Sequence, residues 1–427
     1  IREITNFYHT FLIPNSRIYR RYGEKTIDNI YSVATSALTY ELTRKVYKLL
    51  GLPTDHVMRF SSYDLLNEKS SENKEQVMAI RPDVVCGVPP FNAKAEGGRG
   101  DGGTAEYHKF FNYSKDVISP RYICMLTQST WYNGGRGDGL EEFRDYMLSI
   151  GTNDRHIREL HDYPDIEEYL KGVTTLRGGI CLYMWDKSYS GNCLVVNHIL
   201  HNDYLMERPL RFCYNGHKLN SFIRWNEGLA ILKKVLDKET HFITDNGMMR
   251  KRDPFGFVDN GSDKKYEGTR KSKNCPIKVY LANGKIGYVS EDALTKEKGK
   301  DQLLNKWKVL VAKSSSGTDK LPHMVISDPV VSEPKSVTAH THYVIEGVSS
   351  QVEADNLADY LKTRFARFMM LLLRSNQNMR VDMYKFVPRL DFSQKWTDEM
   401  LFERYELGEY VDFIKTMIKE KNAKSTS

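Results

Sequence analysis

The sequence predicts an α/β protein whose first part is a mostly parallel sheet, and three observations support this class. Apolar segments of strand length alternate with longer segments of helical periodicity through the first 160 residues. One of these strands, residues 83–87, runs directly into a Pro-Pro-aromatic turn. The chain has 427 residues, 40% of them hydrophobic, which is enough for two or three domains with their own cores. Strands that alternate with helices form parallel sheets covered on both faces.

The expected strands are short and bounded by turn residues. They lie at residues 29–33, 56–60, 83–87, 121–127 and 155–160. The helical segments between them lie at residues 36–50, 104–118 and 139–150. Residues 178–185 and 192–197, joined around a Tyr-Ser-Gly turn at 189–191, predict an antiparallel hairpin that closes the sheet.

The second half of the chain has a different pattern. After about residue 200 the alternation stops and Gly, Asn, Lys and Tyr become frequent, which indicates a change of domain. Amphipathic helical periodicity returns at residues 351–374 and 398–421. We therefore expect three parts, at residues 1–199, 200–340 and 341–427, of which the middle is α+β and the last is helical.

Composition excludes several classes. The mean hydropathy is −0.53, and no apolar run reaches the 18 residues that a membrane span needs. Residues 1–25 carry charges and tyrosines throughout, unlike a secretion signal, so we expect a cytoplasmic protein. The six cysteines lie far apart with no zinc-like spacing, which predicts reduced core thiols and no metal site.

The turn Val88-Pro89-Pro90-Phe91 is the most informative local feature. Two consecutive prolines fix φ and provide no backbone donors, so the strand must stop there and present Phe91 at its carboxyl end. In an open α/β sheet, ligands bind outside the carboxyl ends of the strands. The turn therefore predicts a ligand site, and a rigid loop after a buried strand is the alternative.

Positive charge is concentrated in one stretch. The chain has a formal net charge of +7, and residues 250–275 contain eight basic residues against four acids. The basic residues are Arg250, Lys251, Arg252, Lys264, Lys265, Arg270, Lys271 and Lys273. A surface that contacts DNA phosphates is one interpretation, and a solvated loop is the other.

The order of elements and the turn resemble the adenine-N6 DNA methyltransferases of restriction–modification systems, whose strand-four motif reads Asn/Asp-Pro-Pro-Tyr/Phe. The residues at 106–111, 120–131 and 178–193 are similar to the catalytic domain of that family, and those at 386–407 to its carboxyl-terminal part. The resemblance implies a Rossmann-like methyltransferase sheet, an α+β DNA-recognition domain and a helical C-terminal part. It also implies S-adenosylmethionine as cofactor, double-stranded DNA as partner, and a nuclease or another restriction–modification subunit as a possible companion.

The resemblance assigns roles to the residues of the turn. In the family a target adenine is rotated out of the duplex and stacked on an aromatic ring, here Phe91, next to Pro89 and Pro90. Its amino group is held by the first residue of the motif, which accepts a hydrogen bond and aims the nitrogen at the sulfonium methyl. That position is Val88 in this sequence, and its isopropyl group accepts no hydrogen bond.

The resemblance also assigns cofactor positions, namely Glu3, Phe7, His9, Ala34 and Asp64. Glu3 matches an acidic residue of strand one. Phe7 and His9 replace glycines that let the backbone approach the cofactor, and Ala34 replaces the carboxylate that binds the ribose. Asp64 matches an acid next to the adenine ring of the cofactor, although an aspartate there also suits a helix cap.

Four functions follow from these residues. Because the glycine turn, the ribose acid and the amine acceptor are all replaced, we predict a DNA-binding protein with a methyltransferase fold in which methyl transfer is weakened or lost. The alternatives are an active adenine-N6 methyltransferase, a non-catalytic structural or regulatory subunit, and a relative that acts on RNA.

Overall fold

The computed structural model describes residues 29–67, 71–92, 104–134, 138–168, 178–250, 254–255, 268–281, 284–294, 303–314, 321–338, 341–374 and 379–421. The chain forms two compact units, Ile1–Met125 and Leu126–Ser427, and the boundary falls inside strand β4 (Tyr122–Gln128). Each unit is described by itself below.

The first unit has the expected alternation of strands and helices. Its elements are β1 (Ser32–Ala34), α2 (Ala37–Leu50), η2 (Thr54–His56), β2 (Val57–Ser61), η3 (Ser62–Leu66), α3 (Ser71–Ile80), β3 (Val84–Gly87), α4 (Tyr107–Tyr113) and η4 (Ser114–Ile118). β1 pairs in parallel with β2, and β3 with β4. The predicted helix at 104–118 is α4 continued by the π-helical turn η4.

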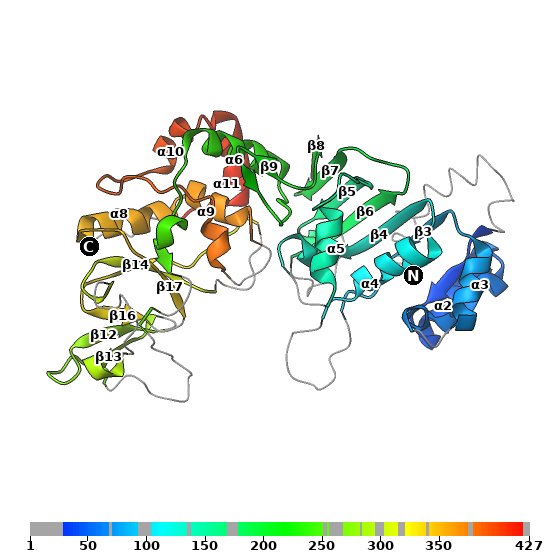
Figure 1. Ribbon diagram of the computed structural model, residues 1–427, viewed down its shortest axis with the longest axis horizontal. Helices are drawn as coiled ribbons and strands as arrows, with labels where there is room; N and C mark the ends of the chain where they lie inside the picture. Colours follow the sequence, from blue (N-terminus) through cyan, green and yellow to red (C-terminus); the bar gives the residue numbers. More distant parts are fainter. Residues whose placement is uncertain are drawn as a thin grey trace. The chain divides into compact units, whose positions relative to one another are not determined.

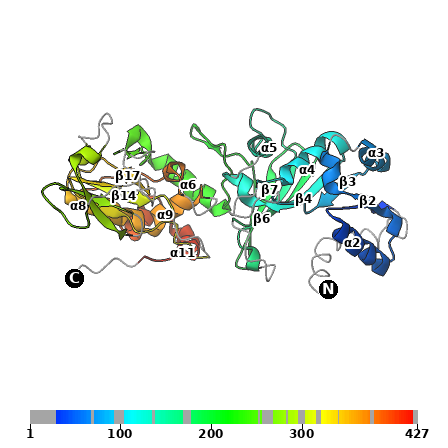
Figure 2. The ribbon, with the colours of Figure 1, turned by 90° about the horizontal axis from the view of Figure 1, so that it is seen from below.

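Helix α2 shows how local chemistry sets an element of this unit. It begins at a capping box, in which the Ser36 hydroxyl accepts a hydrogen bond from the Thr39 N–H at 3.3 Å. It ends at Gly51, whose φ of +72° is the left-handed conformation common after helices. The buried Tyr47 hydrogen-bonds the Ser32 hydroxyl at 2.6 Å, which ties the helix to β1, and Figures 1 and 2 show α2 beside β2.

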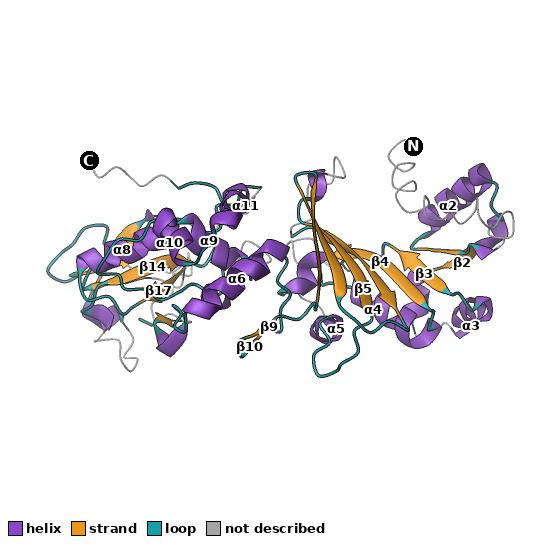
Figure 3. Ribbon diagram, turned by 90° about the horizontal axis from the view of Figure 1, so that it is seen from above, coloured by secondary structure: helices purple, strands orange, loops and turns teal. Residues whose placement is uncertain are grey.

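The largest sheet has the strand order β3-β4-β6-β5-β7-β8. Its further strands are β5 (Ile157–Tyr163), β6 (Ile180–Asp186), β7 (Cys193–Ile199) and β8 (Asn202–Arg208). β5 is antiparallel to β6 and parallel to β7, and β7 is antiparallel to β8. Figure 3 shows β4 and β5 within one twisted layer, and the sheet extends through β8, past residue 199.

The predicted hairpin between residues 178–185 and 192–197 is wrong. β5 lies between the two strands, and the tight hairpin is instead β7-β8. Its two-residue turn is Leu200-His201, with φ of +47° and +61°. Such a turn normally has Asn or Gly, which is why the sequence did not indicate it. The Glu168 carboxylate accepts the backbone N–H groups of both turn residues and so stabilises the turn.

Helix α5 (Leu140–Met147) and the turn η5 (Ser129–Tyr132) cover part of this sheet within the second unit. The Phe143 ring lies 5.7 Å from Trp131 and 6.5 Å from Tyr183 of β6, measured between ring centroids. All three side chains are buried. Burial of such aromatic surface stabilises the packing of α5 on β6.

The remainder of the second unit combines the two-stranded pair of β9 and β10 and two small sheets with helices. Its strands are β9 (Cys213–Tyr214), β10 (His217–Lys218), β11 (Met249–Arg250), β12 (Ile277–Tyr280), β13 (Ile286–Val289), β14 (Lys308–Ala312), β15 (Val330–Ser332), β16 (Ser336–Thr338) and β17 (His342–Ile345). Its main helices are α6 (Asn226–Lys238), α8 (Gln351–Lys362), α9 (Arg364–Leu371), α10 (Asp398–Arg404) and α11 (Val411–Met417). The sheet orders are β11-β17-β14-β15 and β13-β12-β16.

Both long helices predicted in the C-terminal part are divided. The segment 351–374 breaks at Thr363, whose side chain accepts a hydrogen bond from the Ala366 N–H at 3.1 Å and starts a new helix, α9. The segment 398–421 breaks near Glu406, which has a φ of +55°. In both cases an apolar periodicity continues across the break, because both halves pack into one core. The division of the chain at residues 199 and 340 remains a prediction.

The six cysteines are free thiols. Cys181, Cys193 and Cys275 are buried as expected, whereas Cys86 and Cys213 are exposed. In the described part of the chain, no helix is both long and apolar enough to span a membrane.

Candidate functional site

The Pro-Pro-Phe turn lies directly after β3 in the first unit. Val88 is 41% exposed, Pro89 is buried and Phe91 is half-buried. The Phe91 carbonyl accepts a hydrogen bond from the Glu106 N–H at 3.1 Å, and Asn92 forms an antiparallel bridge with Ala105. The turn is therefore held by the residues that lead into α4, and it places an accessible aliphatic side chain where the resemblance expects an acceptor.

The ends of β1 and β2 contain hydroxyl groups and one carboxylate. Ala34, the last residue of β1, is buried. Asp64 Oδ2 accepts a hydrogen bond from the Ser61 N–H at 3.0 Å, and the Ser61 hydroxyl donates to the Thr35 carbonyl at 2.9 Å. Asp64 thus forms the helix cap that was one of its two interpretations, while its contact with a cofactor remains a prediction.

Tyr63 and Glu106 connect the segments after β2 and β3. Burial raises the pKa of Tyr63, and so do the negative charge of Glu106 and its hydrogen bond to the phenol. The Tyr63 ring meets Phe110 of α4 edge-on at 5.6 Å, and Glu106 forms an ion pair with Lys109 at 3.3 Å. The structure therefore brings Tyr63, Glu106 and Phe91 together. No local pattern in the sequence indicates that Tyr63 contacts Glu106, because the two residues lie 43 positions apart in the chain.

Several predicted positions lie outside the described residues. These are Glu3, Phe7, His9, Lys251, Arg252, Lys264 and Lys265.

The described residues of the basic stretch differ in their surroundings. Arg250, in β11, forms an ion pair with Glu346 at 2.5 Å between Nη2 and Oε1. Arg270, Lys271 and Lys273 are exposed next to the turn that Ser272 and Cys275 close. Within the residues that the structure describes, these three side chains form no ion pair. They provide localised positive charge available to a polyanion.

A histidine pair lies on one face of the sheet in the second unit. His161 Nδ1 of β5 is 3.0 Å from His198 Nε2 of β7, and His198 Nδ1 is 2.6 Å from Asp203 Oδ1 of β8. Tyr163 stacks on His198 with ring centroids 4.3 Å apart, and Glu159 lies 3.8 Å from His161 Nε2. Among the described residues, no group of three or more His, Cys, Asp or Glu side chains is arranged to hold a metal ion.

This pair predicts a loss of stability in mild acid. Burial, and next the charge of His198, lower the pKa of His161, while Glu159 and Asp203 oppose the shift. The unfolded chain therefore binds the proton more readily, and the free energy of unfolding falls as the pH drops through the unfolded value near 6.5. Thermal unfolding at pH 7.5 and 5.5 measures this, and His161→Gln is expected to reduce the difference. His201→Gln, at a 79% exposed side chain, is the control; equal effects of both variants would contradict the assignment.

A curated sequence is similar to part of the chain, although no family model matches. A protein of Mycoplasma pneumoniae (strain ATCC 29342 / M129 / Subtype 1), described as an uncharacterized adenine-specific methylase, is 26% identical over 139 residues, which are 31% of this chain and 31% of that protein.

Three solved structures of larger proteins are also similar. The Type ISP restriction-modification enzyme LlaGI, a nuclease-deletion mutant with a DNA substrate mimic, has a TM-score of 0.42 at 12% identity, over 98% of this chain and 51% of that chain. The Type IIL enzyme MmeI with DNA has a TM-score of 0.39 at 11% identity, over 81% and 51%. The DrdV–DNA complex has a TM-score of 0.39 at 9% identity, over 95% and 52%. The chain thus spans about half the length of these solved chains, and less than a third of the curated relative is aligned.

Proposed function

We propose that the chain binds double-stranded DNA in the manner of a site-specific adenine-N6 DNA methyltransferase of a restriction–modification system, with methyl transfer weakened or lost. The observation that carries the proposal is the turn after β3, which keeps the two prolines and Phe91 but presents an exposed Val88 at the position of the amine acceptor. The similarity to a sequence described as an adenine-specific methylase supports the class.

The physical argument against efficient methyl transfer rests on missing acceptors. A purine amino group becomes nucleophilic when its proton is accepted and its lone pair is aimed at the methyl donor. Val88 has no atom that accepts a proton, and Ala34 has none that binds a ribose hydroxyl. Removal of one well-placed hydrogen-bond partner costs roughly two to three orders of magnitude in rate. Loss at both positions leaves a protein that stacks a base without transferring a methyl group at a useful rate.

The DNA-binding part of the proposal predicts a salt effect. Replacing Arg270, Lys271 and Lys273 together by Ala is expected to weaken binding of a DNA duplex and to make its dependence on salt shallower. If each cation meets one phosphate, the slope of log K against log salt concentration drops by about 2.7. Fluorescence anisotropy with a labelled duplex at several salt concentrations measures the slope.

The matched control replaces three exposed lysines that lie outside this stretch. Lys218, Lys233 and Lys415 belong to β10, α6 and α11 and are exposed. The control has the same change in net charge, so a general electrostatic effect would alter both variants equally. Equal slopes for the two triple variants would refute a DNA surface at residues 270–273.

The second candidate is an active methyltransferase that binds its cofactor in another way. It is favoured by Glu106, whose backbone N–H donates to the Phe91 carbonyl of the turn and whose carboxylate hydrogen-bonds the Tyr63 phenol. Calorimetric titration with S-adenosylmethionine separates the two candidates. We expect a dissociation constant weaker than about 100 μM, roughly 5.5 kcal/mol; tighter binding would favour the active enzyme. A non-catalytic subunit that binds neither DNA nor cofactor is the third possibility, and the same two measurements identify it.

A further inference from the structure

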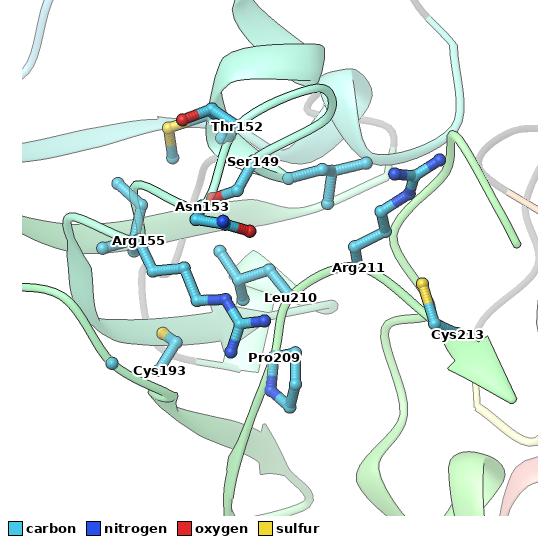
Figure 4. Close-up of a pocket in the computed structure, with 13 residues that line it drawn as sticks. Ser149, Thr152, Asn153, Arg155, Cys193, Pro209, Leu210, Arg211 and Cys213 are labelled. Carbon is cyan, nitrogen blue, oxygen red and sulfur yellow. The ribbon is translucent and has the colours of Figure 1, made fainter.

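A cavity of about 240 Å³ lies in the second unit, between the end of α5 and the ends of three strands. Its walls come from the loop between α5 and β5, from the start of β7 and from the segment that follows β8. Two arginines, Arg155 and Arg211, line it, and no acidic side chain does. Figure 4 shows them on either side of Leu210. We infer that this cavity binds a nucleotide unit whose negative charge is met by these two arginine side chains.

The guanidinium groups retain free capacity for an anion. Arg155 Nη1 donates to Asn192 Oδ1 at 3.4 Å, and Arg211 donates to the Leu219 carbonyl and to Asn220 Oδ1, both at 3.2 Å. Neither arginine forms an ion pair with a described residue. Each guanidinium has five N–H donors, so most of them are available. An arginine without a carboxylate partner suits a phosphate, which it binds through bidentate charge-assisted hydrogen bonds.

Two other arginines of the same sheet, in contrast, have charged or buried partners within the protein. Arg158, in β5, faces Asp186 of β6 at 3.7 Å. Arg208, at the end of β8, is buried and donates to Asn226 Oδ1 and the Ile223 carbonyl, each at 2.8 Å. Arg158 is half-exposed and paired with a carboxylate, whereas Arg208 is buried and hydrogen-bonded inside the fold. Arg155 and Arg211 differ from Arg158 in having no carboxylate partner among the described residues, and from Arg208 in lining a cavity.

The remaining walls favour a ligand larger than inorganic phosphate. Met147, Leu148, Ile157 and Leu210 are buried apolar residues of the wall. Burial raises the pKa of the Cys193 thiol to about 12, so this wall residue adds no negative charge at neutral pH. Thr152 accepts the Asp154 N–H at 3.0 Å and keeps its hydroxyl proton for a ligand. An apolar wall next to two cations suits a sugar and base attached to a phosphate.

The size of the cavity limits the ligand. Small-molecule sites usually measure about 300–1,000 Å³, so this cavity of about 240 Å³ lies below the usual range and takes no more than one nucleotide. The nucleotide unit that occupies the cavity is either a free mononucleotide or one nucleotide of a DNA strand. The inference is independent of the cations at 270–273, so it can hold or fail separately from the proposed DNA surface.

The test uses adenosine 5′-monophosphate and inorganic phosphate as probes in calorimetric titrations of the full chain. Arg155→Gln alone is the first variant, because this side chain is exposed and we expect the fold to tolerate its replacement. The double variant with Arg211→Gln follows, checked for folding by circular dichroism. We expect each substitution to weaken the nucleotide by about tenfold. Arg158→Gln is the matched control and should leave the affinity unchanged.

A further variant tests the apolar wall. Leu210→Gln should weaken the nucleotide while inorganic phosphate binds as before. Competition with a DNA duplex identifies the source: displacement of the nucleotide by DNA assigns the cavity to a DNA strand, and independent binding assigns it to a free nucleotide. Absence of binding of both probes at millimolar concentration, or equal loss in the Arg158→Gln control, would overturn the inference. DNA affinity that depends on residues 270–273 while the nucleotide fails to bind would leave the proposed function standing.

Discussion

Replacement of Asp162 by Asn is expected to lower the free energy of unfolding by about 3–5 kcal/mol, because it leaves a charged arginine without its partner inside the protein. Asp162, in β5, is fully buried. Its Oδ2 lies 3.0 Å from Arg224 Nε, although the N–H is not aligned as a hydrogen bond. The Tyr132 hydroxyl donates to Oδ1 at 3.0 Å, and Asn197 donates to Oδ2 at 3.4 Å.

The position of Arg224 makes this carboxylate important to the whole unit. Arg224 comes just before α6, and its guanidinium also donates to the Gly178 carbonyl ahead of β6. It lies over the Tyr132 ring at 5.1 Å. An Asn side chain has the size of Asp but no charge. The guanidinium would then stay in a site of low dielectric with no counter-charge, where a single charge is costly.

Urea denaturation at pH 7 measures the change. The control is Glu406→Gln, which removes the acid of an exposed ion pair with Lys238 and should have a much smaller effect. Equal losses in both variants would show that the pair is not structurally important.

Substitution of Gly179 by Ala is expected to destabilise the protein by about 2–5 kcal/mol. A Cβ at this position would collide with the Tyr163 carbonyl oxygen and lie 2.7 Å from that of Pro164. Both neighbours are backbone atoms at the end of β5, so the strand itself must move. Gly179 also has a φ of +78°, a conformation that costs an alanine roughly 1–2 kcal/mol.

Gly151→Ala separates the two contributions. Gly151 has a φ of +79°, and a Cβ added there would have no atom within 4 Å, so its substitution adds conformational strain without a collision. Thermal and urea unfolding of both variants give the comparison. The difference between them measures the steric contact at the β5–β6 edge. A Gly179 variant as stable as the Gly151 variant would mean that this edge adjusts freely.

The pairing of the strands needed information that is not local. The positions of β1, β2, β3, β4 and β5 were predicted to within a few residues, because short apolar runs between turn residues are typical of strands. The sequence did not show as clearly which strands pair with one another. The Leu200-His201 turn lacks Gly and Asn and is held by Glu168, a residue more than thirty positions earlier, so its hairpin was missed.

For the candidate site, too, some features follow from the sequence and others only from the tertiary structure. The sequence by itself determined that a strand ends in Pro89-Pro90-Phe91 and that Val88 and Ala34 have no acceptor atoms, because covalent structure fixes proline φ and side-chain chemistry. Only the tertiary structure placed Glu106 against Phe91 and Tyr63. It also decided that Arg155 and Arg211 share one cavity. Such contacts join segments far apart in the chain, and they are set by the packing of the whole core, which no local pattern encodes.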